Sequence, residues 1–180
     1  MNSVEDVLSE LSRRGVMTVT RAPGYASLVE SVVGGPVKGS WWAHPRGGEI
    51  YRLLTALNDH PDVLMAKLIA GKVTLVHRKL WPDLLRVLTD EGWRSERLDQ
   101  LDAPARALLA RVEAEGALRL DQLGGDRRAL KKSRDQLESA LLVHVDQEHT
   151  EKGRHENVLE SWTRWMKRAG VRVDRRVSVD

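Results

Sequence analysis

Apolar side chains recur at helical spacing in the first half of the chain. Val4, Val7, Leu8 and Leu11 form one such stripe, and Gly15 follows it as a glycine typically follows the end of a helix. The same spacing predicts further helices over residues 25–33, 50–57 and 82–91. Runs rich in β-branched residues predict strands over 16–19, 63–69 and 73–80. The last two strands flank Ala70-Gly71-Lys72, which predicts a hairpin.

The second half repeats this order of patterns. A helix over 104–115 ends at Gly116, and a short extended piece at 117–120 follows it. We expect a brief helix at 121–123, a longer helix over 126–140 capped by Asp126, and a closing helix over 159–168. Strands over 143–150 and 154–160 flank a second hairpin turn at Lys152-Gly153. Residues 93–103 are polar, and this composition predicts a linker.

Each half therefore has the order helix, short strand, helix, helix, hairpin, helix. This is the order of a winged helix-turn-helix, in which the third helix contacts DNA and the hairpin is the wing. We predict a mainly α protein with small β-hairpins (α+β) and tandem winged helix-turn-helix domains. Its parts would be residues 1–92, a linker at 93–103, a second domain at 104–170 and a tail at 171–180. The alternative is a single α+β domain with two hairpins.

Composition excludes several classes of chemistry. The chain has 180 residues and no cysteine, so it has no disulfide, no thiolate metal site and no cysteine nucleophile. No apolar run approaches the ~18 residues of a membrane span, and the acidic start Met1–Asp6 lacks an apolar signal core. We therefore expect a cytoplasmic, bacterial-type protein without a membrane partner. Phosphate-loop, dinucleotide, zinc-protease and serine-elbow motifs are all missing, so we expect no cofactor and lean against an enzyme.

The total charge of the chain gives little information about its partners. The formal net charge is +3, with 11 basic and 10 acidic residues in 1–92 and 18 and 16 in 93–180. Neither half is strongly basic, so any case for a polyanionic partner rests on local clusters.

One such cluster lies on the predicted helix at 126–140. Arg127, Lys131 and Arg134 share one face at spacings of four and seven residues, and Arg128 and Lys132 extend it. The leucines take the opposite side, so this helix could bury its leucines and lay its cations along DNA phosphates or against guanine. The alternative is an ordinary solvated helix face.

The turn of the second hairpin supplies another candidate contact. Gly153 permits a tight turn, and Lys152, Arg154 and His155 would project where a wing meets the DNA backbone. The alternative is that these charges only keep an edge soluble.

A glycine-bounded loop at 39–48 holds two adjacent tryptophans. One exposed ring of Trp41 or Trp42 could stack on a base or ligand, with Arg46 beside it for a phosphate. We place His44, His77 and Arg78 in the same candidate site. The alternative is that both rings fill the core in place of the absent phenylalanines.

The histidines predict no metal site. His44, His60 and His77 lack a short ligand spacing. We expect His144, Asp146 and His149 on the surface of the second sheet. The four other tryptophans at 81, 93, 162 and 165 are predicted to be packing anchors.

The second half also resembles a known family. The residues concerned are His149-Thr150-Glu151-Lys152-Gly153-Arg154-His155, Leu159-Glu160-Ser161-Trp162, Trp165 and Leu118-Arg119-Leu120-Asp121-Gln122-Leu123. They resemble bacterial winged-helix proteins related to the AlkZ-type DNA glycosylases over 104–168. The first half resembles them only in its order of elements.

That resemblance implies tandem winged helices that bind DNA. The glycosylases of the family excise alkylated or crosslinked bases with a Gln-apolar-Gln or Gln-apolar-Asp motif. Here Gln100-Leu101-Asp102 fits the pattern, but it lies in the predicted linker and not on a strand. The chain is also short for the family's full set of domains. The resemblance therefore implies DNA binding without evident glycosylase chemistry.

Three functions follow as expectations. The first is a duplex DNA-binding protein of DNA repair or transcription regulation, in which charge reversal at Arg128 and Lys132 weakens binding and flattens its salt dependence. The second is an enzyme or small-ligand protein that uses the Trp41–Gly48 loop, and a relative of the DNA glycosylases is the enzyme we would expect. The third is a protein-interaction module built from winged helices. The sequence leaves homo-oligomerisation open.

Overall fold

The computed structural model describes residues 1–149 and 155–173, and the chain forms two compact units, Met1–Trp81 and Pro82–Asp180. Each unit combines helices with one three-stranded antiparallel sheet. The prediction of a mainly α protein with small β-hairpins is confirmed at this level.

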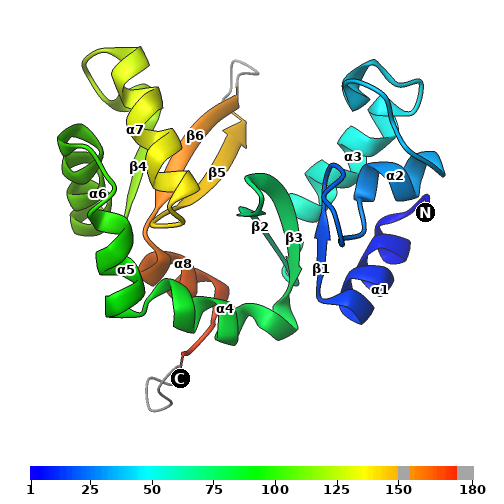
Figure 1. Ribbon diagram of the computed structural model, residues 1–180, viewed down its shortest axis with the longest axis horizontal. Helices are drawn as coiled ribbons and strands as arrows, with labels where there is room; N and C mark the ends of the chain where they lie inside the picture. The colour runs from blue at the N-terminus through cyan, green and yellow to red at the C-terminus, as the bar shows by residue number, and fades with distance from the viewer. Residues whose placement is uncertain (150–154, 174–180) are drawn as a thin grey trace. The chain divides into compact units, whose positions relative to one another are not determined.

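Unit 1 places three helices on one side of its sheet (Figure 1). The strands are β1 (Val16–Thr18), β2 (Val63–Ile69) and β3 (Lys72–His77), in the order β1-β3-β2. The helices are α1 (Val4–Arg14), α2 (Leu28–Val33) and α3 (Gly47–Asn58), with short 3₁₀ turns η1 (Trp41–Ala43) and η2 (Arg78–Leu80).

The core of unit 1 follows from the register of this sheet. Leu75 on the central strand pairs with Met17 on one side and Met65 on the other, so the three side chains form a row on one face. Leu11 and Ile50 pack against that row from the helices and are fully buried.

Unit 2 has the elements α5 (Glu91–Leu98), α6 (Ala103–Glu115), β4 (Ala117–Arg119), η3 (Leu120–Gln122), α7 (Arg127–Ser139), β5 (His144–His149), β6 (His155–Glu160) and α8 (Trp162–Ala169). Helix α4 (Trp81–Leu88) precedes them. The strand order is β4-β6-β5, and helices α6 and α7 pack against each other (Figure 1).

The core of unit 2 is built in the same way. Leu159 on the central strand pairs with Leu118 and Val145, which again gives a row of three apolar side chains on one face. Val112 and Leu137 cover that row from α6 and α7, and both are fully buried.

The two units also share a detail at the ends of helices α1 and α6. Gly15 ends α1 with φ 84° and ψ −39°, and Gly116 ends α6 with φ 81° and ψ −40°. The carbonyl of Gly15 accepts the N–H of His77, and that of Gly116 accepts the N–H of Ser161, each at 2.8 Å. The end of α1 is therefore bonded to the last residue of β3, and the end of α6 to the residue that follows β6.

The predicted linker at 93–103 is wrong for most of its length. Asp90 caps α5 by accepting the N–H of Trp93, and that helix continues to Leu98. Trp93 packs against the unit 2 core, and Leu101 is buried within it. Helix α5 was not predicted because most of its residues are polar and few of them show an apolar helical spacing. The chain divides after Trp81, earlier than the predicted boundary at 92.

No helix in the described part of the chain is long and apolar enough to cross a membrane.

Candidate nucleic-acid interface

Helix α7 is held by its two ends and its apolar side. Asp126 caps the helix by accepting the N–H of Arg128 at 2.9 Å. Leu137 and Ser133 are buried against the domain. This side packs, so the opposite side of the helix is left to solvent.

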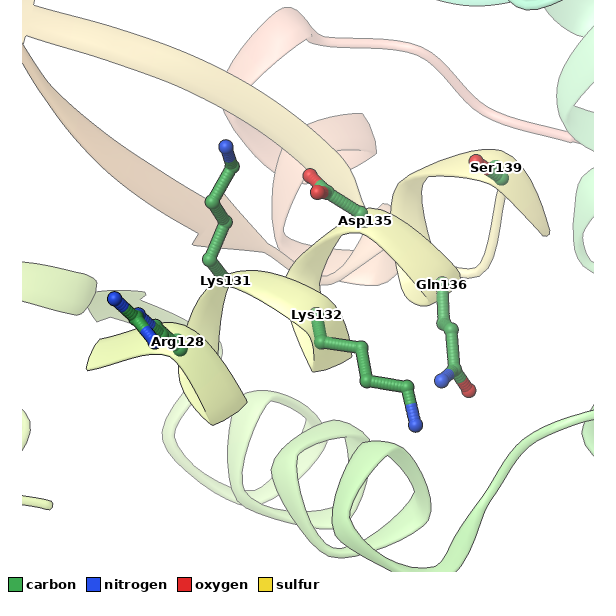
Figure 2. A pocket seen from close by; sticks show the side chains of 6 residues that line it. All are labelled: Arg128, Lys131, Lys132, Asp135, Gln136 and Ser139. Atoms are coloured by element: carbon green, nitrogen blue, oxygen red, sulfur yellow. The ribbon is translucent and has the colours of Figure 1, made fainter. Parts of the chain in front are cut away.

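The exposed side of α7 forms a shallow hollow of about 540 Å³. The residues that line it are spaced three and four apart and so form one stripe: Arg128, Lys131, Lys132, Asp135, Gln136 and Ser139. Figure 2 shows that Lys131 and Asp135 leave one edge of the stripe, whereas Lys132 and Gln136 leave the other.

Two cations of this stripe have no acidic partner in the described part of the chain. No hydrogen bond or ion pair among the described residues engages the guanidinium of Arg128 or the ammonium of Lys131, and both residues are exposed. Both charges are therefore free to meet an anion.

Lys132 and Gln136 are held by Asp102 at the start of α6. Asp102 Oδ2 accepts from Lys132 Nζ and from Gln136 Nε2, each at 2.8 Å, and Asp102 Oδ1 accepts the N–H of Ala105 at 3.0 Å. The hydrogen bond from Lys132, and then those from Gln136 and Ala105, lower the pKa of Asp102 to about 2. The charge of Lys132 is therefore largely balanced by Asp102 within the unit.

Arg127 and Arg134 differ from the pair of free cations. Arg127 is exposed, and its Nη2 donates to the carbonyl of Asp121 at 3.4 Å. The side chain of Arg134 is only 16% exposed and pairs with Asp135. Of the five cations predicted on this helix, Arg128 and Lys131 are therefore the best placed to bind an anion.

The predicted wing contacts lie mostly outside the described residues. Lys152, Gly153 and Arg154 fall in the gap at 150–154, and the side chain of His155 is likewise not described.

The tryptophan loop divides its two rings between core and solvent. Trp41 packs against the unit 1 core, whereas Trp42 is 62% exposed. The two rings are stacked with their centroids 4.0 Å apart, and Tyr51 of α3 lies 5.5 Å from Trp42. The alternative that both rings fill the core is wrong, because Trp42 remains outside it.

Arg46 and His44 form hydrogen bonds within the loop and with the elements next to it. The guanidinium of Arg46 donates to both oxygens of Glu49, at 2.7 and 2.6 Å, and also to the carbonyl of Val32. The hydrogen bond from Arg46 lowers the pKa of Glu49. His44 Nδ1 accepts the N–H of Arg46 at 3.1 Å. The donors of Arg46 predicted for a phosphate are therefore committed to this corner of unit 1.

His77 and Arg78 lie elsewhere in unit 1. His77 Nδ1 accepts the N–H of Lys79 at 3.2 Å, and Arg78 lies 3.6 Å from Asp62 and 5.8 Å from the ring of Trp81. No described contact joins either side chain to the tryptophan loop. The structure therefore does not bring all six predicted residues into one site.

Two contributors were missed in the sequence. Tyr51 joins the aromatic group although it lies on the next helix, and only its position one turn into α3 hinted at this. Asp102 was assigned to the glycosylase-like string, whereas it is the N-cap of α6 with a proline just inside the helix. That capping signal was present in Asp102-Ala103-Pro104.

A second charged group is buried at the end of β6. Glu160 accepts from Arg168 Nη2 at 2.8 Å and lies 3.6 Å from Arg164, and it raises the pKa of Arg168. His144 lies beside it, with its ring centroid 5.7 Å from that of Trp162 and 5.9 Å from that of Trp165, and is 7% exposed. The predicted surface position of His144 is wrong because α8 covers the start of β5. The tryptophans of α8 are packing anchors, as predicted, and this cluster fastens α8 to the sheet.

No group of three or more histidine and acidic side chains is placed to hold a metal ion within the described ranges.

Comparison with models of protein families, with curated proteins and with solved structures finds no match. The resemblance to proteins related to the AlkZ-type glycosylases therefore remains a prediction from the residues.

Proposed function

We propose that the protein binds duplex DNA through unit 2, with α7 along the DNA and the β5–β6 hairpin as its wing. The observation that carries this proposal is the exposed stripe of α7, where Arg128 and Lys131 have no acidic partner in the described chain. Cations of this kind bind phosphates by releasing counterions, and an arginine can also contact guanine.

The arrangement of elements supports a winged-helix architecture for both units. Each runs helix, strand, short helix or turn, helix and hairpin, and each sheet places the third strand in the centre. The repeated glycine cap and its bond to the end of the last strand further favour two copies of one design. In a helix-turn-helix protein the second helix of the pair is the one that enters the major groove. In unit 2 that helix is α7.

We do not assign base excision to this protein. In the string that fits the glycosylase motif, Leu101 is buried in the core and Asp102 is engaged by Lys132, Gln136 and a helix cap. This carboxylate therefore has a structural task, which is to hold two helices together. We therefore propose a DNA-binding protein of repair or transcription regulation rather than an enzyme.

The test compares two double variants with equal loss of charge. Arg128→Gln with Lys131→Gln removes both free cations of α7. The matched control, Arg111→Gln with Lys167→Gln, removes two exposed cations from α6 and α8. Lys132 is left unchanged because Asp102 holds it. Binding to a labelled 20-base-pair duplex is measured by fluorescence anisotropy between 50 and 200 mM salt.

We expect the α7 variant to bind about tenfold more weakly or worse. Its plot of log K against log salt should be shallower by about 1.8, since each phosphate contact contributes about 0.9. The control should keep most of its affinity and slope. Equal losses in both variants would mean that only the net charge matters, and unchanged binding by a folded α7 variant would refute the proposal.

A further inference from the structure

Unit 1 lacks the cationic stripe of unit 2 but exposes an aromatic surface in the corresponding place. Helix α3 holds the position that α7 holds in the order of elements, and Arg52 is its one basic residue. The tryptophan pair of η1 lies directly before this helix and contacts Tyr51 in its first turns.

The local fold keeps the ring of Trp42 outside the core. Trp41 packs against the unit 1 core, and the ring of Trp42 stacks on Trp41 at 4.0 Å and stays 62% exposed. A side chain at Gly47 would begin 3.0 Å from the carbonyl oxygens of both tryptophans, so this turn is closed tightly by a glycine. The ring of Trp42 is therefore held on Trp41 within a tightly closed loop.

The exposed surface has the size of one ring. Among the described residues, Trp42 and Tyr25 are the exposed large hydrophobic side chains, with 62% and 45% of their surface accessible. A stable protein interface buries about 800 Å² on each partner. A single indole backed by another indole is far smaller than this, but it matches the flat face of a nucleobase.

The charges near this ring suit a nucleotide. The charge of Glu49 is balanced by Arg46, which donates two hydrogen bonds to its carboxylate, at 2.7 and 2.6 Å. Arg52 follows Tyr51 on α3 and is exposed, and its charge helps to lower the pKa of Glu49. Arg52 is therefore an exposed cation on the helix that also carries Tyr51, the neighbour of Trp42.

We propose that unit 1 binds an unpaired nucleotide of a nucleic-acid strand, with its base stacked on Trp42. This inference rests on the proposed DNA binding and assigns the two units different tasks. Trp41 and Tyr51 act as positioning residues, because they hold the ring of Trp42 from behind and from the side.

The test uses the full chain with a labelled single strand of twelve thymidines and a fully paired 20-base-pair duplex. Trp42→Ala should weaken binding of the single strand by about fivefold or more, the lower end for one base–aromatic stack. Its duplex affinity should stay unchanged. Trp42→Phe keeps a flat ring and should retain most of the affinity, and Tyr25→Ala is the control for loss of an exposed aromatic.

The outcomes separate this inference from the proposed function. Intact duplex binding together with single-strand binding that ignores Trp42→Ala would overturn the stacking site and leave the proposed function standing. Duplex binding that ignores the loss of Arg128 and Lys131 would instead refute the role of α7. Two results would show another occupant and overturn the inference: thymidine monophosphate alone binding as tightly as the strand, or a change of oligomeric state on size-exclusion chromatography of Trp42→Ala.

Discussion

Asp102 is the residue at which two helices of unit 2 meet. Its carboxylate caps α6 and also accepts hydrogen bonds from Lys132 and Gln136 of α7. One side chain therefore fixes the start of one helix against the middle of the next. This contact sets which lysine of α7 is engaged and which is free.

The Asp102 contact predicts a dependence of stability on acid. Its pKa is about 2 in the folded protein, below its ordinary value of 3.8. A carboxylate with a lowered pKa stabilises the fold above its unfolded value, and that contribution is lost as the pH falls from about 4 through about 2. Asp102→Asn should therefore lower the melting temperature at pH 6, and its deficit should shrink as the pH approaches 2. Thermal unfolding by circular dichroism at several pH values measures this.

Glu10 also has a pKa lowered to about 2 by Arg13 and Arg14 and titrates in the same range. The comparison must therefore be the difference between wild type and variant, from which Glu10 cancels. A deficit that stays constant from pH 6 to pH 2 would show that the charge of Asp102 does not contribute.

At the residue scale, the sequence predicted which side of a helix a side chain occupies better than it predicted the hydrogen-bond partner of that side chain. Arg128, Lys131 and Lys132 were correctly placed on the exposed side of one helix, because helical spacing settles that. Spacing could not show that Lys132 is paired, since its partner lies thirty residues earlier in the chain. The same limit applies to Arg46, whose donors reach Val32 and Glu49 rather than solvent.

The hairpin of β2 and β3 illustrates what turn chemistry adds at the scale of an element. The turn is formed by Ala70 and Gly71, whose φ angles are 48° and 67°. Both angles are positive, as in the type I′ turns that suit the twist of a hairpin. Glycine adopts such a conformation freely, whereas alanine is strained there.

Ala70→Asn should stabilise this hairpin. Asparagine tolerates the left-handed conformation, and Asn-Gly is the favoured pair for this turn, so we expect a gain of about 0.5–1 kcal/mol. Urea unfolding at constant m-value measures it. The control is Lys72→Asn at the neighbouring position, which begins β3 outside the turn and should give no gain. A destabilised Ala70→Asn would show that another feature of the turn dominates.

Most elements were predictable because their hydrophobic period and their end signals agree. Helices α1 and α6 each carry an apolar stripe and end at a glycine, and both were predicted. Helix α5 was not predicted, because its apolar residues Trp93 and Leu98 are widely spaced among polar ones. Its capping residue Asp90 was the one local signal of its start.

At the scale of the whole molecule, one order of elements occurs twice with different surfaces. The central rows of the sheets hold Met17, Leu75 and Met65 in unit 1 and Leu118, Leu159 and Val145 in unit 2. These residues differ in identity but keep their apolar character and their register. The repeat could therefore be predicted from the pattern, whereas the division of surface chemistry needed the exposed face of each helix.

The glycine caps give a prediction for both units at once. Gly15→Ala and Gly116→Ala each force alanine to adopt a φ near 80°, which should cost about 1–2 kcal/mol. At Gly15 the added methyl would also lie 2.7 Å from Leu80 Cδ1, whereas at Gly116 the nearest atom is Arg164 Cδ at 3.1 Å. Gly15→Ala should therefore be the more destabilising of the two.

Thermal unfolding of the two variants measures the difference. Gly34→Ala, which places alanine at a φ of 87° and a ψ of 16° and meets no atom within 4 Å, is the reference for a positive φ without a steric contact, and Gly116→Ala is the match in backbone angles for Gly15→Ala. A larger loss for Gly34→Ala than for Gly15→Ala would contradict the steric part of the argument.

The bond from the end of the last strand to each glycine carbonyl has a consequence for dynamics. The amide of His77, the last residue of β3, donates to the end of α1, and the amide of Ser161, directly after β6, donates to the end of α6. Each bond breaks when either of its two elements moves away, so exchange of these amide protons with deuterium should report the opening of the contact between helix and sheet. The two exchange rates, measured in one sample, would then show whether this contact opens equally often in both halves of the chain.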